Sequence, residues 1–173
     1  PPIGCMHRNT YLRCMIFPFQ KKIWLATGLL AVTIAGYGQV QSAAYRLMLK
    51  KMLSHSVPEM QVQEAAKGAQ DILFFDAREE KEFAVSHLAG ALCVGYDSFD
   101  IKKIPASIDK RQRIVVYCSV GYRSEKVTEQ LRAAGYSDVS NLYGGIFEWV
   151  NQHHPVFNDQ GATSAVHAYS RTW

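Results

Sequence analysis

The sequence predicts an α/β fold: a small, mostly parallel β-sheet flanked by helices on both faces, preceded by an N-terminal leader and an amphipathic helix. After Pro58, short apolar segments rich in β-branched and aromatic residues alternate with stretches of helical character. The apolar segments are nearly continuous, which is typical of parallel strands that are buried on both faces. The chain has 173 residues, 48% of them hydrophobic and 20% charged, which is enough for about one such domain and its core.

A secretory leader is expected first. Lys21-Lys22 precede an apolar run over residues 23–35, and small residues follow at positions 36 and 38. An uncleaved membrane anchor is the alternative, but a spanning helix needs about 20 apolar residues and this run is shorter. We therefore expect export, to the periplasm or outside the cell, with membrane contact only through an uncleaved leader. A second cleavage position follows Ala44.

An amphipathic helix is expected next, over residues 44–54. Its apolar residues recur at the spacing of one helical face: Tyr45, Met48, Leu49, Met52 and Leu53. The pattern leaves open whether this face packs on the domain or joins it to a membrane surface.

The remaining elements alternate along the chain. Strands are expected at four segments, residues 72–78, 91–96, 113–119 and 139–145. Helices are expected between and after them, at residues 79–88, 100–108, 124–134 and 145–154, with Gly135 ending the third helix. The predicted organisation is a leader over residues 1–38, a helix and linker over 39–56, one domain over 57–155, and a C-terminal extension over 156–173. The chain begins with Pro-Pro, so we expect either that Met6 or Met15 is the start or that residues before Pro1 are missing. The chain ends at Trp173, and whether the C-terminal extension is truncated there stays open.

Charge and cysteine content exclude several classes of function. Four of the 19 basic residues precede the apolar run of the leader, and the rest of the chain contains 15 basic and 15 acidic residues. A nucleic-acid-binding surface is not expected, because it requires clustered excess positive charge on the folded domain. Cys93 and Cys118 lie outside the N-terminal region, neither is in a C-x-x-C motif, and no metal site or organic cofactor is predicted.

The segment VVYCSVGYRSEKV, residues 115–127, carries the candidate chemistry. It leads from a strand into Cys118, through a short loop and into a helix. Ligands of open parallel sheets bind beyond the carboxyl ends of the strands, and loop N–H groups at a helix N-terminus attract anions. These surroundings favour a reactive thiolate. Gly121 allows the turn, and Arg123 supplies a cation for an anionic substrate or holds the loop. A buried structural cysteine is the alternative interpretation.

Residues 57–155 resemble the rhodanese-like domain family. Four ordered motifs carry the resemblance: Asp76-Ala-Arg78; Glu82-Phe83 with His87-Leu-Ala-Gly90; Tyr117-Cys118-Ser-Val-Gly121-Tyr-Arg123; and Leu142-Tyr-Gly144-Gly145 with Trp149. The resemblance implies that Cys118 is a persulfide-forming nucleophile. It also implies that Ser119, Val120, Gly121, Tyr122 and Arg123 complete a six-residue substrate cradle. The resemblance further implies that Asp76, Arg78 and His87 organise the fold near the loop, with contact to the substrate as the alternative. Gly144-Gly145 would form a close turn, and Trp149 would pack in the core.

The expected function is sulfur transfer. The Cys118 thiolate would take the sulfane sulfur of a small anionic donor such as thiosulfate, or of a persulfide, and pass it to a thiol or cyanide. Phosphatase relatives have a cradle that looks one residue longer than the C-x4-R spacing here, so phosphate hydrolysis is less favoured. A binding or regulatory module without turnover is the other alternative.

Cys93 stands where many relatives have a polar residue. By family topology it lies on an edge strand, with the Asp76 strand between it and Cys118, so a disulfide between the two cysteines is not expected. We also expect its strand to be buried and its thiol therefore to react slowly.

Overall fold

The computed structural model describes residues 43–168. The chain divides into two compact units, Pro1–Ala44 and Tyr45–Trp173. Residues 43 and 44 of the first unit are helical. The predicted leader, residues 1–38, lies outside the described residues. Among the described residues, the structure contains no helix that combines the length and the apolar character needed to span a membrane.

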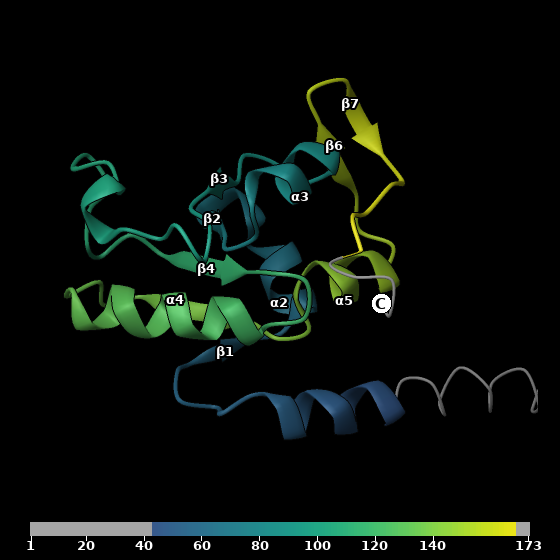
Figure 1. Ribbon diagram of the computed structural model, residues 1–173, viewed down its shortest axis with the longest axis horizontal. Helices are drawn as coiled ribbons and strands as arrows, with labels where there is room; N and C mark the ends of the chain where they lie inside the picture. The colour runs from purple at the N-terminus through teal and green to yellow at the C-terminus, as the bar shows by residue number, and fades with distance from the viewer. Residues whose placement is uncertain (1–42, 169–173) are drawn as a thin grey trace, which may run out of the picture. The chain divides into compact units, whose positions relative to one another are not determined.

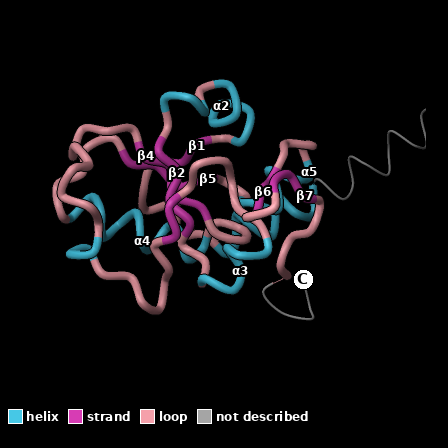
Figure 2. Tube along the Cα trace, turned by 90° about the horizontal axis from the view of Figure 1, so that it is seen from above, coloured by secondary structure: helices cyan, strands magenta, loops and turns pink. Residues whose placement is uncertain are grey.

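Five strands of the second unit form one sheet, with the order β1-β5-β4-β2-β3. Figure 1 shows β3, β2 and β4 one after another within it. The strands are Glu59–Met60 (β1), Leu73–Asp76 (β2), Leu92–Cys93 (β3), Ile114–Tyr117 (β4) and Val139–Leu142 (β5). Every neighbouring pair in this sheet runs parallel. Figure 2 shows its strands gathered in the centre of the domain with helices around them. The predicted α/β fold class is therefore confirmed.

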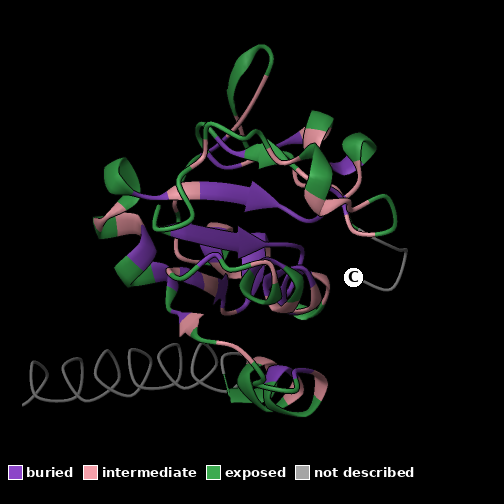
Figure 3. Cartoon of the chain, turned by 90° about the vertical axis from the view of Figure 1, so that its left-hand side faces the viewer, coloured by how far each residue is buried: buried purple, intermediate pink, exposed green. Residues whose placement is uncertain are grey.

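Both faces of the sheet are buried, because successive residues of its strands point to opposite sides. In β4, Val115 and Tyr117 enter one core cluster, while Ile114 and Val116 enter the other. This explains why the strands read as continuous apolar runs in the sequence. Figure 3 shows the buried strands at the centre and exposed surfaces on the surrounding loops and helices.

Helices cover the two faces unequally. The cluster on one face includes residues of Val62–Lys67 (α2) and Gly145–Asn151 (α5), with Glu80–Val85 (α3) packed against it through Phe83. The other face is covered mainly by Tyr122–Ala133 (α4) and by the segment that follows β3. Helix α4 corresponds to the third predicted helix and begins two residues earlier than expected. Gly135 follows the end of α4 with a φ of 92°.

The predicted amphipathic helix is present over residues 43–52. From Tyr45 onward, its apolar face packs against the second unit: Leu49 and Leu53 are buried with Val120, and Tyr45, Met48 and Met52 are partly buried around them. Burying a leucine side chain contributes roughly 1.5–3 kcal/mol, so these contacts hold the segment firmly. Of the two possibilities left open by the sequence, the structure shows packing on the domain.

Three segments differ from the sequence-based expectation. A helix over residues 100–108 is wrong: the structure has a single 3-10 turn, Ile101–Lys103, begun by a hydrogen bond from Lys102 N–H to the Asp100 carboxylate and followed by Pro105. The short elements β1 and α2 were not predicted. Val156–Asn158 (β6) and Gly161–Thr163 (β7) form an antiparallel hairpin in the segment expected as an extension. Val156 is buried in the core.

The expected burial of the Cys93 strand is also wrong. Leu92 and Cys93 are both exposed, because β3 is an edge strand with β2 as its only neighbour in the sheet. The predicted topology is confirmed, since β2 separates β3 from the strand that precedes Cys118. Both thiols are free.

Candidate active site

Cys118 lies directly after β4, at the carboxyl end of the sheet, and its side chain is buried. The loop that follows is short: α4 begins at Tyr122, and Gly121 precedes it with a φ of 116°, in the left-handed region. The backbone N–H of Gly121 donates a hydrogen bond to the Cys118 sulfur at 3.2 Å. A residue with a side chain would strain this turn, so glycine allows the N–H to point back at the sulfur.

The back of the loop is held by α5. The carbonyl oxygens of Cys118 and Ser119 accept hydrogen bonds from the N–H groups of Ile146 and Phe147, at 2.9 and 3.2 Å. A Cβ at Gly145 would lie only 2.3 Å from the Cys118 carbonyl oxygen, so this close approach requires glycine. In a trans peptide the N–H points opposite to the preceding carbonyl. The N–H groups of Ser119 and Val120 therefore point away from α5.

Asn141 of β5 fixes the end of the loop. Its side-chain N–H group donates to the Gly121 carbonyl at 3.0 Å, and its oxygen accepts from the Ser124 hydroxyl at 2.7 Å. Asn141 and Ser124 are both fully buried. Sequence reasoning did not single out Asn141, because an asparagine in a strand carries no signal of the loop it will meet.

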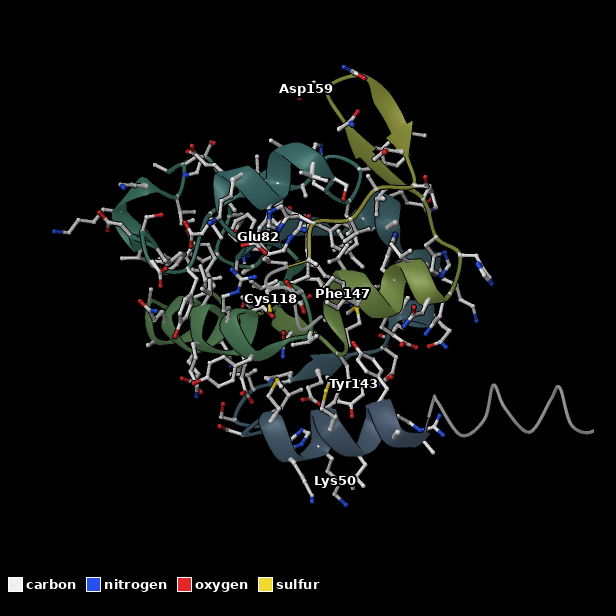
Figure 4. The ribbon with its side chains drawn as sticks, turned by 45° about the vertical axis from the view of Figure 1, so that its right-hand side comes forward. Lys50, Glu82, Cys118, Tyr143, Phe147 and Asp159 are labelled. Carbon is white, nitrogen blue, oxygen red and sulfur yellow. The ribbon has the colours of Figure 1, made fainter. Side chains whose placement is uncertain are left out.

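Arg123 is bound by Glu82, another residue that sequence reasoning did not assign to the site. Its guanidinium donates to both carboxylate oxygens of Glu82, each at 2.8 Å, and to the Ser119 hydroxyl at 3.1 Å. Glu82 is fully buried on α3. Figure 4 shows Glu82 near Cys118, between α3 and α4. Arg123 thus links the loop to α3, and since it also lines the cavity, its contact with an anionic substrate stays a prediction.

The charges of this pair are mutually stabilised. Burial on its own would raise the pKa of the Glu82 carboxyl, but the hydrogen bonds and charge of Arg123 outweigh it and hold that pKa below its usual value. Burial would lower the pKa of Arg123, and the Glu82 carboxylate and the Cys118 sulfur raise it instead. Both groups are therefore ionised at neutral pH.

Asp76 and Arg78 form a separate, fully buried ion pair. The Arg78 guanidinium donates to the Asp76 carboxylate at 2.6 to 3.1 Å and to the Ser86 carbonyl at 2.5 Å, and it lies over the Tyr117 ring at 5.7 Å. The phenol oxygen of Tyr117 accepts the N–H of Leu88 at 3.1 Å. These contacts join β2, β4 and the segment after α3, which fits the structural role expected for Asp76 and Arg78.

His87 also serves the packing of the fold. Its ring stacks on Phe83 with centroids 3.9 Å apart, and its Nδ1 lies 3.0 Å from the Phe83 carbonyl oxygen. Its backbone pairs with Phe157 of the hairpin. Trp149 is buried in the core, as expected. Asp76, Arg78 and His87 are not among the residues that line the cavity beside Cys118.

That cavity has a volume of about 390 Å³. Five lining residues come from the Cys118 loop and the first turn of α4, and three come from other segments: Cys118, Ser119, Val120, Tyr122 and Arg123, with Met52, Tyr96 and Asp97. The structure therefore brings the predicted nucleophile and most of the predicted cradle together around one space. Sequence reasoning missed the wall formed by Met52, Tyr96 and Asp97, which lie far from the loop in the chain. Among the described residues, no group of acidic, histidine and cysteine side chains could hold a metal ion.

The class of protein is defined by two features: a parallel α/β domain, and a buried cysteine between a strand and the loop that leads into a helix. The sequence profile of the Rhodanese-like domain matches residues 60–152. The chain belongs to the rhodanese-like domain family.

Curated relatives match less than half of the chain. A tRNA uridine(34) hydroxylase of Listeria welshimeri is 36% identical over 83 residues, covering 44% of this chain and 25% of the relative. A protein of the same name from Listeria monocytogenes is 39% identical over 83 residues, with the same coverage. The chain thus spans about a quarter of the length of the curated relatives it matches.

Solved structures show the same fold. A thiosulfate sulfurtransferase from Pseudomonas aeruginosa superimposes with a TM-score of 0.54 at 22% identity, covering 67% of this chain and 22% of that one. The rhodanese-like domain of a protein from Anabaena sp. gives 0.54 at 20% identity, covering 66% and 92% of the two chains.

Proposed function

We propose that this protein is a sulfurtransferase that carries sulfur as a persulfide on Cys118. The observation that carries the proposal is the position of the Cys118 sulfur: it lines a cavity, accepts the Gly121 N–H, and precedes a helix N-terminus. Backbone N–H groups and a helix dipole stabilise a negatively charged sulfur, and the thiolate is the nucleophilic form of cysteine.

Transfer would take two steps. The Cys118 thiolate attacks the sulfane sulfur of thiosulfate or of a persulfide; a new S–S bond forms, the donor's bond to that sulfur breaks, and sulfite or a thiolate leaves with the electron pair. A thiol or cyanide then attacks the outer sulfur, and Cys118 leaves as thiolate. In the persulfide the negative charge lies on the outer sulfur, where N–H groups of the loop would stabilise it.

Two alternatives rest on weaker support. A binding or regulatory module without turnover needs no cysteine in this position. The hydroxylase activity named for the Listeria proteins belongs to chains about four times as long as the matched part. We do not extend it to this chain, because the sequence beyond residue 45 contains 15 basic and 15 acidic residues, with no excess for binding nucleic-acid phosphates.

Intact mass spectrometry tests the proposal. After incubation with thiosulfate or an organic sulfane donor and removal of excess reagent, the protein should gain one sulfur atom, and cyanide should remove it as thiocyanate. Cys118→Ser should gain none, and Cys93→Ser should behave as the parent. A chain that gains no sulfur from either type of donor, or gains it equally without Cys118, would contradict the proposal.

We further propose that the protein is exported, on the basis of the Lys21-Lys22 pair and the apolar run that follows. N-terminal sequencing of protein from its native host should begin at Gln39 or Tyr45. An intact N-terminal region on protein from the cytoplasm would contradict it.

A further inference from the structure

The cavity beside Cys118 is large and largely apolar for a small inorganic donor. Its volume of about 390 Å³ is in the range of sites that hold organic ligands, about 300–1,000 Å³. Met52, Val120, Tyr96 and Tyr122 are among the residues that line it. Tyr122 is 44% exposed at the start of α4. Such walls gain free energy by covering an apolar ligand, and they gain little from an inorganic anion.

The charges around the cavity also disfavour a dianion. Arg123 lines the cavity, but its guanidinium is bound through two N–H groups to the buried Glu82 carboxylate, so its charge is balanced inside the protein. Asp97 is an exposed residue that also lines the cavity, so it brings a second acidic side chain to this region. With Glu82 and Asp97 together against Arg123, the fixed side-chain charge near the reacting sulfur is negative before any donor enters.

The segment that carries Asp97 is held in place. The Glu79 carboxylate accepts the N–H groups of both Tyr96 and Asp97, each at 3.2 Å. The N–H groups of Val94 and Gly95 donate to the Asp76 carbonyl, at 2.9 and 3.2 Å. Four backbone N–H groups of this segment therefore donate hydrogen bonds that fix it at the cavity.

Glu79 and Glu82 connect this segment to the cradle. They form a reciprocal cap at the N-terminus of α3, in which the Glu82 carboxylate accepts the Glu79 N–H at 3.2 Å. Glu79 thus holds the Asp97 segment while Glu82 holds Arg123. One helix end positions both the acidic wall and the neutralised cation.

We propose that the cavity takes an organic sulfur carrier of low negative charge, whose body lies against Met52, Tyr96 and Tyr122, and that Asp97 selects against inorganic dianions. This inference rests on the proposed sulfurtransferase function and specifies its donor. The matching acceptor would be an organic thiol of the same kind, since both must reach the same sulfur.

Three sulfur donors test separately how donor size and donor charge affect the transfer: thiosulfate, methanethiosulfonate and benzenethiosulfonate. In each case the Cys118 thiolate takes the sulfane sulfur, the S–S bond to Cys118 forms, and sulfite or a sulfinate leaves with the electron pair. The first donor is a dianion, and the other two are monoanions that differ in the ring. For the parent protein, kcat/KM should rise in the order given, with benzenethiosulfonate above thiosulfate by about tenfold or more.

Variants test each wall. Asp97→Asn should raise kcat/KM for thiosulfate by about threefold to tenfold and should change the monoanions less, because the repulsion scales with donor charge. Added salt should reduce this effect. Tyr122→Ala should lower the ratio of benzenethiosulfonate to methanethiosulfonate. Asp159→Asn, in the β6–β7 turn far from Cys118 (Figure 4), is the matched control and should change none of these values.

The outcomes distinguish the two proposals. Absence of sulfur on Cys118 with all three donors would overturn the sulfurtransferase function and this inference with it. Loading of Cys118 with thiosulfate preferred, or an Asp97→Asn variant that does not favour thiosulfate, would overturn this inference alone. A Tyr122→Ala variant that leaves the ratio of the two monoanions unchanged would overturn the assignment of the aromatic wall.

Discussion

Replacing Arg123 with alanine should destabilise the folded domain, because it would leave the buried Glu82 carboxylate without its main partner. The guanidinium makes two hydrogen bonds of 2.8 Å to Glu82, whose side chain is fully buried, and retains 12% of its own surface in solvent. Breaking a buried ion pair from one side typically costs about 3–5 kcal/mol. Since Arg123 is partly exposed, we expect the lower end, about 3 kcal/mol of unfolding free energy at neutral pH.

The loss should depend on pH in a defined direction. In the parent, Arg123 holds the pKa of Glu82 below its usual value despite burial. That pair therefore contributes stability above the unfolded pKa of about 4.3, and the contribution is lost as pH falls through the folded pKa. Without Arg123, burial dominates and raises the pKa of Glu82 in the folded state. The loss of unfolding free energy in Arg123→Ala should then be largest near neutral pH and should become smaller as the Glu82 carboxyl is protonated.

Urea denaturation of both proteins at neutral and mildly acidic pH measures this difference. Arg113→Ala is the control: it breaks an ion pair with Asp138 whose side chains are 51% and 47% exposed, and such pairs contribute about 0–1 kcal/mol. Glu82→Gln in the Arg123→Ala background should recover part of the loss by removing the buried charge. A loss below about 1 kcal/mol with no pH dependence would refute the reasoning.

Two further predictions concern other parts of the domain. Gly145→Ala should lower the unfolding free energy by more than the roughly 1–3 kcal/mol of a strained backbone alone, because its Cβ would meet the Cys118 carbonyl. Gly90→Ala, with a similar φ of 67° and open space around it, measures the backbone cost by itself. Equal losses of unfolding free energy in the two variants would contradict the steric explanation. Cys93 is exposed as a residue, but partial burial of its sulfur and the charge of Asp76 raise the pKa of its thiol to about 11. Alkylation of Cys93 should therefore be slow at neutral pH and should accelerate toward pH 11. A rate at neutral pH equal to that of an unhindered thiol would contradict this.

Features that depend on local periodicity were predictable from the sequence. The apolar side chains that the helix and Leu53 pack against the domain were identified residue by residue, because these five side chains follow the helical repeat. The position of Cys118 between a strand and a helix followed from the change in pattern around it. The resemblance to rhodanese-like domains supplied the order of the motifs.

Features that depend on distant pairs were not predictable. Glu82 and Arg123 are 41 positions apart, and nothing in either segment indicates that they will meet. The same holds for the Asp97 segment, which reaches the cavity through hydrogen bonds to Glu79 and Asp76. Strand β1 contains two residues, too few to show a period. Cys93 was expected in a buried strand because its neighbours are apolar, but an edge strand is open along one side.

The docking of the upstream helix changes where the functional domain begins. The family match starts at residue 60, yet Met52 lines the cavity, Leu49 and Leu53 cover Val120, and the buried Glu125 accepts the N–H groups at positions 54 and 56, each at 3.0 Å. A fragment cut at the family boundary would keep the sulfur loop but expose an apolar patch beside it. The helix over residues 43–52 therefore lies ahead of the matched region, yet it forms part of the wall around Cys118. Changes within that helix could retune which molecules reach Cys118 without altering any residue of the cradle.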